Sequence, residues 1–229
     1  MKTFKVFSLL LSYPTAELQA AMPELEKLLH EEGLISSRRQ QELATLLGEL
    51  RSRDIYDLQE RYVLLFDRSR TLSLNLFEHV HGESRDRGGA MVDLLEMYRA
   101  GGFDLAGTEL PDHLPVLLEY LSTRSLKEAR AILADAGPIL VALEERLARR
   151  SSPYAAIFDT LVTIAAANPA SEEAKVLLSE EDDDPEDLAA LDAVWEEAQV
   201  TFGPDPNAGC PVSRDILARM DPAPARAAS

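Results

Sequence analysis

Apolar residues along this chain recur three and four positions apart, the spacing that places them on one face of an α-helix. Phe4, Phe7 and Leu11 follow this spacing near the start, and residues 157–164 follow it far downstream. No segment alternates apolar and polar residues between Asn-Gly or Asp-Gly turns, as the strands of a hairpin do. No repeat of fixed period and no heptad run is present, which argues against a solenoid and a coiled coil. The pattern predicts an all-α fold, a single domain of roughly nine or ten helices.

Local signals mark the ends of several of these helices. Asp54 and Ser125 can accept hydrogen bonds from the free N–H groups of a first helical turn, so each is expected to begin a helix. Gly33 suits the left-handed conformation that often ends one. Residues 88–89 and 101–102 are glycine pairs, and we expect a helix between them.

The composition limits which classes of protein this can be. The 229 residues carry a formal net charge of −17, the wrong sign for a general nucleic-acid binder or a protein held on anionic lipid by charge. Hydrophobic residues make up 46% of the chain, enough at this length to bury a core without disulfides. The single cysteine excludes an intramolecular disulfide and any multi-cysteine metal site, and it fits a reducing compartment.

No segment has the length of a membrane span. The apolar run at residues 161–167 is seven residues long, whereas a span needs about 20. The N-terminus superficially resembles a signal peptide, but Lys5 and Ser8 interrupt its apolar stretch, and Glu17 follows without a small-residue cleavage site. We therefore interpret it as the first helix of a cytoplasmic protein.

The end of the chain differs in composition from the rest. Residues 172–205 hold 13 acidic residues and one basic residue, which indicates a solvated linker because like charges repel. Residues 188–195 carry a short amphipathic pattern within it. We expect a helical domain over residues 1–170, an acidic segment over 171–202 and a mobile Pro/Ala-rich tail over 203–229.

Motifs of the familiar enzyme families are absent from the sequence. It contains no Gly-rich phosphate loop, no G-x-G-x-x-G, no G-x-S-x-G and no H-E-x-x-H. Cys210 lies in the tail, where a catalytic thiol would lack the fixed base that it needs. Tyr62 and Phe66, at helical spacing, are interpreted as core residues and not as rings that stack on a ligand.

A polar stretch between two apolar elements is the densest group of candidate functional residues. Its members are Phe77, Glu78, His79, His81, Glu83, Arg85, Asp86 and Arg87. One interpretation is metal binding by His79 and His81 with a carboxylate, although side chains two positions apart on a helix point about 200° away from each other. A second is a structural turn whose charges cap helix ends and pair with one another. A third is a partner-binding surface that presents arginine and acidic groups.

A second group consists of Pro111, Asp112 and His113, with Tyr120 further along the same segment. Pro111 suits the first turn of a helix, and Asp112 in that turn would be favoured by the helix dipole and could cap free N–H groups. Asp112 and His113 could also form a general-base pair, but no nucleophile lies nearby in the sequence. Structural capping is the default interpretation.

These residues also carry a resemblance to a known family. The blocks concerned are residues 66–70, 73–74, 76–88, 90–95, 109–115 and 191–197. In them the sequence resembles the NarJ-type nitrate reductase assembly chaperones, from the N-terminal helix to about residue 202. The block through Arg87 is specific to that family, whereas the Pro-Asp-His element is shared with the chaperones of other molybdenum reductases.

The resemblance implies an all-helical, cytoplasmic chaperone that is not an enzyme, has no cofactor of its own and does not remain in the finished enzyme. It implies that the partner is the catalytic (alpha) subunit of the membrane-bound respiratory nitrate reductase, whose N-terminal segment binds as a short helix. The chaperone would keep this subunit competent for insertion of the molybdenum cofactor and delay its membrane attachment. It would neither insert into the membrane nor bind nucleic acid, and direct contact with the molybdenum cofactor is not implied. The partner-binding residues suggested by the resemblance are Phe77, Glu78, His79, His81, Glu83, Arg85, Asp86, Arg87, Asp112, His113 and Tyr120.

Two other functions stay open on the residues alone. One is a metal-dependent hydrolase that uses His79, His81 and His113, and the other is a general helical scaffold without a single client. A chaperone needs an apolar groove for a partner helix, and an acidic rim would favour a basic or amphipathic target. If His81 or His113 contacts that target, the affinity should change between about pH 6 and 7.5.

Overall fold

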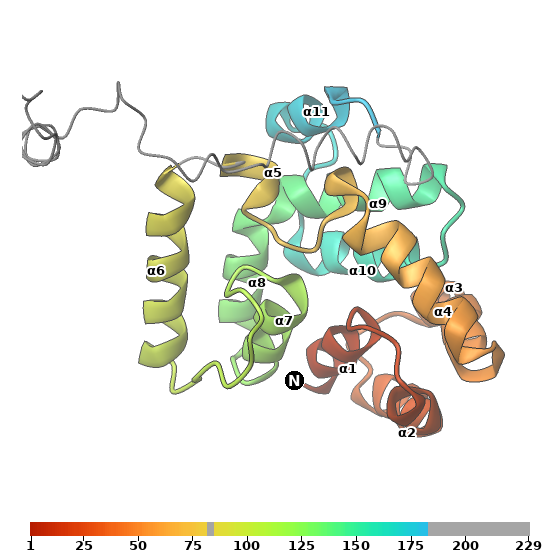
Figure 1. The fold of residues 1–229 in the computed structure, drawn as a ribbon. Coiled ribbons are helices and arrows are strands. Elements are labelled where there is room, and N and C mark those ends of the chain that lie inside the picture. Colours follow the sequence, from red (N-terminus) through yellow and green to blue (C-terminus); the bar gives the residue numbers. More distant parts are fainter. Residues whose placement is uncertain (82–84, 183–229) are drawn as a thin grey trace, which may run out of the picture. The chain divides into compact units, whose positions relative to one another are not determined.

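Eleven α-helices, one π-helical turn and one 3₁₀ turn make up the part of the chain that the computed structural model describes, residues 1–81 and 85–182 (Figure 1). The helices are α1 (Lys2–Leu10), α2 (Ala16–Glu32), α3 (Ser37–Ser52), α4 (Ile55–Tyr62), α5 (Glu78–His81), α6 (Arg85–Ala100), α7 (Leu114–Ser122), α8 (Leu126–Asp135), α9 (Gly137–Arg149), α10 (Ala155–Ala165) and α11 (Glu172–Ser179). The π-helical turn η1 (Val63–Asp67) and the 3₁₀ turn η2 (Arg70–Leu72) follow α4. No strand occurs within these residues, so the all-α prediction is confirmed.

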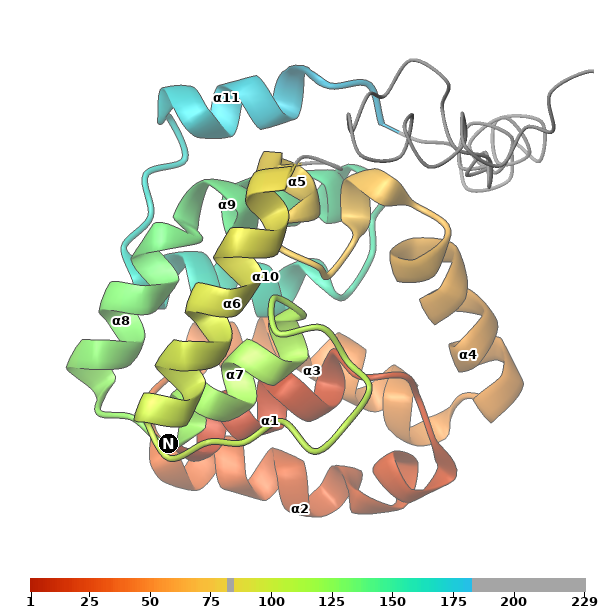
Figure 2. The same ribbon diagram turned by 60° about the vertical axis from the view of Figure 1, so that its left-hand side comes forward.

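Helix α1 packs against both α2 and α7, and Figure 2 shows it between them. Phe4, Phe7 and Leu10 have no exposed surface, so the apolar face expected from the sequence is buried. Burying one such side chain stabilises a fold by about 1.5–3 kcal/mol. The segment that resembles a signal peptide is therefore a central part of the core. No helix among the described residues combines the length and the apolar character that crossing a membrane requires.

The second half of the described chain packs around α9. Helices α10 and α11 both contact α9, and α10 also contacts α8 and α3, which joins this group to the N-terminal helices. Ile157 and Leu161 of α10 are fully buried. Tyr62 and Phe66 are 4% and 5% exposed, and their ring centroids lie 5.1 Å apart. The interpretation of these two rings as core residues is confirmed.

Three of the local signals act as expected. The Asp54 carboxylate accepts a hydrogen bond from the N–H of Tyr56 at 2.8 Å at the start of α4. Ser125 and Glu128 form a capping box at the start of α8. Gly33 ends α2 with a φ of 62°, a conformation that other residues adopt only at a cost.

The expectation for the first glycine pair is wrong. Helix α6 begins at Arg85 and continues through Gly88 and Gly89, where the sequence pattern predicts a helix that starts after them. A glycine inside a helix costs about 0.5–1 kcal/mol relative to alanine, so the first half of α6 is intrinsically weak. Tyr98 is the one buried residue among those of α6 whose side chains are described. Figure 1 shows α6 at the edge of the described helices.

The acidic segment does not begin as a solvated linker. Residues 172–179 form α11, which packs on α9 and buries Ala174 completely and Leu177 to 8% exposure. Apolar residues at helical spacing outweigh the local charge here, because a partner surface is available on α9. The amphipathic pattern at residues 188–195 and the thiol of Cys210 lie outside the described residues.

Candidate partner-binding site

Two segments that are distant in the sequence run antiparallel to each other. The N–H of Leu76 donates to the carbonyl of Asp112 at 3.1 Å, and the N–H of Leu114 donates to the carbonyl of Leu74 at 2.8 Å. An isolated β-bridge lies between these two bonds. Residue 74 is a bend, Asn75 forms the bridge and residues 76–77 form a turn, so only α5 after them is helical. The bridge brings the two candidate groups of the sequence analysis together.

Asp112 is fully buried at this pairing. Its Oδ2 accepts a hydrogen bond from the N–H of Phe77 at 2.9 Å, while Oδ1 has no hydrogen-bond partner among the described residues. Burial raises the pKa of this carboxyl group, and the hydrogen bond from Phe77 acts against the change. Asp112 therefore ties the segment before α5 to the segment before α7.

The helix-capping interpretation of Pro111 and Asp112 is wrong. Helix α7 starts only at Leu114, with Pro115 in its first turn, so both residues precede the helix. The carbonyl of Pro111 instead accepts a hydrogen bond from the hydroxyl of Tyr98 at 2.7 Å. Pro111 and Asp112 therefore make contacts with distant segments, and neither of them caps α7.

Side-chain hydrogen bonds continue from the bridge to α6. His113 Nδ1 lies 3.1 Å from Asn75 Oδ1, so this nitrogen faces the amide and not Asp112, contrary to a general-base pair. Asn75 Nδ2 donates to Glu78 Oε1 at 3.2 Å. Arg87 Nη2 donates to the same Glu78 oxygen at 3.2 Å, which links α6 to α5. Asn75, which the sequence analysis did not single out, is the centre of this network.

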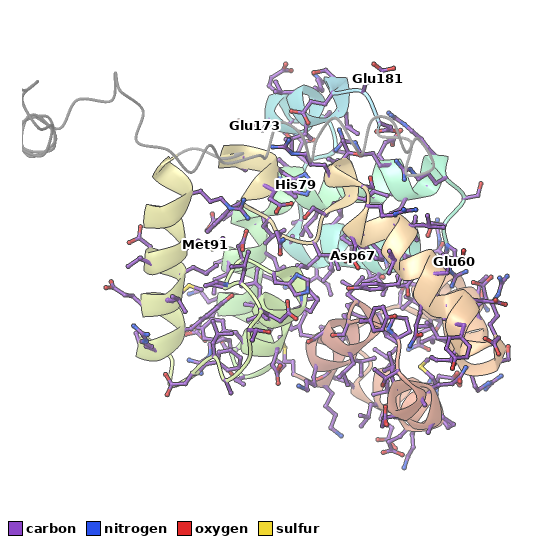
Figure 3. All side chains as sticks on the ribbon, viewed as in Figure 1. Glu60, Asp67, His79, Met91, Glu173 and Glu181 are labelled. Atoms are coloured by element: carbon purple, nitrogen blue, oxygen red, sulfur yellow. The ribbon has the colours of Figure 1, made fainter. Side chains whose placement is uncertain are left out.

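His79 turns inward toward the same segment (Figure 3). Its Nε2 lies 2.8 Å from the carbonyl of Ser73, and the ring donates to that carbonyl in the tautomer that carries its proton on Nε2. Burial lowers the pKa of His79, and the positive charge of Arg146 lowers it further. Together with the Glu78–Arg87 pair, this bond supports the structural-turn interpretation for the described part of the stretch.

Metal binding gains no support from the structure. Among residues 1–81 and 85–182, no group of three histidine, cysteine or carboxylate side chains is placed to hold a metal ion. Glu83 and the side chains of His81, Arg85 and Asp86 lie outside what the structure describes, so their part in a site stays a prediction.

Tyr120 lies in the interior, 4% exposed. Its ring centroid is 4.8 Å from that of Tyr98 and 5.8 Å from that of Phe103. The guanidinium carbon of Arg124 lies 4.9 Å from the centroid of the Tyr120 ring. Tyr120 thus contacts the site indirectly: its ring packs against Tyr98, whose hydroxyl donates a hydrogen bond to the carbonyl of Pro111. In this structure Tyr120 supports the site from within.

A groove of about 370 Å³ opens beside His113, bordered by residues of α1, η1 and α7. It is lined by Ser8, Ser12, Tyr13, Tyr62, Asp67, Glu109, His113, Pro115, Val116 and Glu119. We call it the His113 groove. Figure 3 shows Asp67 at the end of η1, which continues α4 and lies above α1. Of the lining residues only His113 is a site residue in the sequence analysis, because the others come from separate segments that no single motif spans.

Comparison with known proteins points to one family. The model of the nitrate reductase delta subunit family matches residues 15–160. The chain is 44% identical over 206 residues to the nitrate reductase molybdenum cofactor assembly chaperone NarJ of Escherichia coli (strain K12), which covers 89% of this chain and 86% of that protein. It is 43% identical over 212 residues to the probable nitrate reductase molybdenum cofactor assembly chaperone NarW of the same strain, with 92% and 87% covered. It is 30% identical over 160 residues to the probable chaperone NarJ of Bacillus subtilis (strain 168), with 70% and 86% covered.

Proposed function

The chain belongs to the nitrate reductase delta subunit family of assembly chaperones, which are not enzymes, and from this we propose that it assembles a respiratory nitrate reductase. The client is the catalytic subunit, which the chaperone binds notably through the client's N-terminal segment. In the complex the client stays competent for insertion of the molybdenum cofactor, and its membrane attachment is delayed. The chaperone does this in the cytoplasm and does not remain in the finished enzyme.

One observation carries this proposal: the similarity to proteins named as molybdenum cofactor assembly chaperones extends over most of both chains. A metal-dependent hydrolase is not favoured, because the relatives are named as chaperones and the described residues contain no metal cluster. A general scaffold is not favoured either, because the names of these relatives specify a single enzyme system.

The His113 groove is a suitable place for part of the client segment. Its volume of about 370 Å³ falls in the range of sites that bind small molecules, roughly 300–1,000 Å³, so it accommodates a few side chains. An amphipathic helix would lay one face over the groove and insert side chains from successive turns. Pro115 and Val116 line it with apolar atoms, and the ring of Tyr13, which is 46% exposed, offers further apolar contact.

The remaining candidate residues act around this groove. His113 lines it directly, whereas Asp112 and Tyr120 are buried and hold its surroundings in place. The Glu78–Arg87 pair and the His79–Ser73 hydrogen bond keep the neighbouring turn in one conformation. A preorganised surface of this kind reduces the conformational entropy that is lost when a flexible segment binds.

Calorimetric titration tests the proposal. The titrant is a synthetic peptide from the N-terminus of the cognate nitrate reductase catalytic subunit, and the control is the same composition in scrambled order. Saturable heat with the native peptide alone is the expected result. No heat from either peptide, with a folded and monodisperse sample, would count against this client segment. An affinity pull-down that returned many unrelated proteins without preference for the reductase would favour the general scaffold.

A further inference from the structure

We infer that the His113 groove receives a lysine or arginine side chain of the client segment, and that Asp67 and Glu109 are the groups that recognise it. This inference rests on the proposed function, because the client segment is the occupant. It adds to that function a chemical requirement: the bound face of the client helix carries a basic residue at the position that meets the groove.

Two acidic residues that line the groove have no cationic partner within the described part of the chain. Asp67 and Glu109 form no ion pair with any residue that the structure describes, and both are exposed to an incoming ligand. Glu119, which also lines the groove, is already paired with Lys5 of α1. Both carboxylates are therefore available to a cationic occupant, and a positive charge placed between them is attracted by both.

His113 does not supply that positive charge. Burial lowers the pKa of its imidazole, even though the charges of Glu109, Asp112 and Asp67 act to raise it. The ring is therefore neutral near pH 7. At Asp67 partial burial raises the pKa, the charge of Glu109 raises it further, and His113 acts in the opposite direction. A carboxylate with a raised pKa of this origin is stabilised in its charged form when a cation binds beside it.

An aromatic ring at the same groove suits a basic side chain. Tyr13 is 46% exposed, and its ring meets that of Tyr62 edge to face, with centroids 5.6 Å apart and an angle of 89°. Its free surface can attract a lysine or arginine head group through the ring quadrupole. Pro115 and Val116 provide apolar surface for the methylene stem of such a side chain.

Other occupants fit less well. A second copy of this chain, with its net charge of −17, is repelled by the same carboxylates. A bound metal ion would need a set of converging ligands, and the described residues contain no such cluster. A basic amphipathic segment satisfies the carboxylates, the tyrosine ring and the apolar wall together.

A double-mutant cycle tests the inference. The full chain and its Asp67→Asn/Glu109→Gln variant are titrated with the native client peptide and with peptides in which each lysine or arginine is changed singly to glutamine. The matched control is Glu24→Gln, an exposed carboxylate on α2 that does not line the groove. Circular dichroism before each titration checks folding, and the single variants replace the double variant if it does not fold.

We expect the double variant to bind the native peptide about five- to tenfold more weakly, with less sensitivity to salt, and the control variant to bind as the wild type does. One of the glutamine peptides should bind the wild type more weakly and show no further loss with the double variant. Equal affinity of wild type and double variant for the native peptide overturns the inference, as would a client segment without any basic residue. Failure of the wild type to bind at all refutes the proposed client segment instead, so the two outcomes are distinct.

Discussion

The carboxylate of Asp112 accepts a hydrogen bond from the backbone N–H of Phe77 at 2.9 Å, and the two residues lie 35 positions apart in the sequence. This bond stands beside the antiparallel pairing of the segments before α5 and α7. Asp112 has no exposed surface, so its carboxylate is withdrawn from water at its end of this partly buried bond. The wall of the His113 groove is thus anchored by a residue that does not itself line it.

Asp112→Ala should lower the free energy of unfolding by about 1–3 kcal/mol, because it removes the buried carboxylate that accepts a hydrogen bond from the N–H of Phe77. Asp112→Asn keeps an acceptor oxygen and should cost less. Urea unfolding followed by circular dichroism compares the two variants with the wild type. An alanine variant as stable as the wild type would show that the bond contributes nothing to the fold.

Arg146 should be the most sensitive single position in the described C-terminal half. Its side chain has no exposed surface and donates to the carbonyls of Thr71 at 3.0 Å and Leu177 at 2.6 Å, and to the carboxylate of Asp182 at 2.9 Å. Arg146→Ala removes the donor to the buried carbonyls of Thr71 and Leu177 and the partner of the Asp182 carboxylate, and we expect a loss of about 3–5 kcal/mol. Asp182→Asn, on the partly exposed partner, should cost about 1 kcal/mol or less. Thermal and urea unfolding of both variants measure the difference, and equal stability of the two would contradict the central role of Arg146.

Gly88→Ala and Gly89→Ala should each stabilise α6 by about 0.5–1 kcal/mol, because alanine has less conformational freedom to lose than glycine. Apart from the backbone of α6 itself, a Cβ at either position meets no atom of the described residues within 4 Å, so no clash there opposes the gain. Hydrogen exchange of the α6 amides provides the measurement, with slower exchange expected. Gly33→Ala is a control of opposite sign, read from faster exchange of the α2 amides, because Gly33 ends α2 with a φ of 62°. Unchanged exchange in both α6 variants would mean that this helix is already held by its surroundings.

Stability should fall as the pH drops below about 6.5, the ordinary pKa of histidine. Burial lowers the pKa values of His79 and His113 in the folded state, so the unfolded chain takes up protons that the folded chain cannot. The free energy of unfolding is therefore fully maintained above that pH and decreases below it, with a slope of at most about 1.4 kcal/mol per pH unit for each histidine. Urea unfolding at a series of pH values measures this slope.

His79→Gln and His113→Gln should each remove their own part of that slope. A profile that both variants leave unchanged would show that other groups cause the acid sensitivity. The same burial affects peptide binding: if His113 contacts the client, its effect on affinity is moved to lower pH than the window of about 6 to 7.5 expected for an ordinary histidine.

Much of the fold could be predicted because it depends on residues close together in the chain. The spacing of Phe4, Phe7 and Leu11, the caps at Asp54 and Ser125, and the left-handed Gly33 each act within one or two turns of a helix. Prediction failed where a distant surface competed with the local pattern. The charge of residues 172–179 indicates a linker, but burial of Leu177 against α9 makes them a helix.

The same distinction between local and long-range causes applies to the candidate site. By itself the sequence determined an all-α chain, its resemblance to nitrate reductase assembly chaperones and the importance of the segments around Glu78 and Asp112, since composition, periodicity and motif are properties of the order of residues. Only the tertiary structure decided that Asp112 holds Phe77 and that Asp67, Glu109 and His113 line one groove. Those relationships join segments far apart in the chain, and their distances follow from how the helices and the segments between them pack.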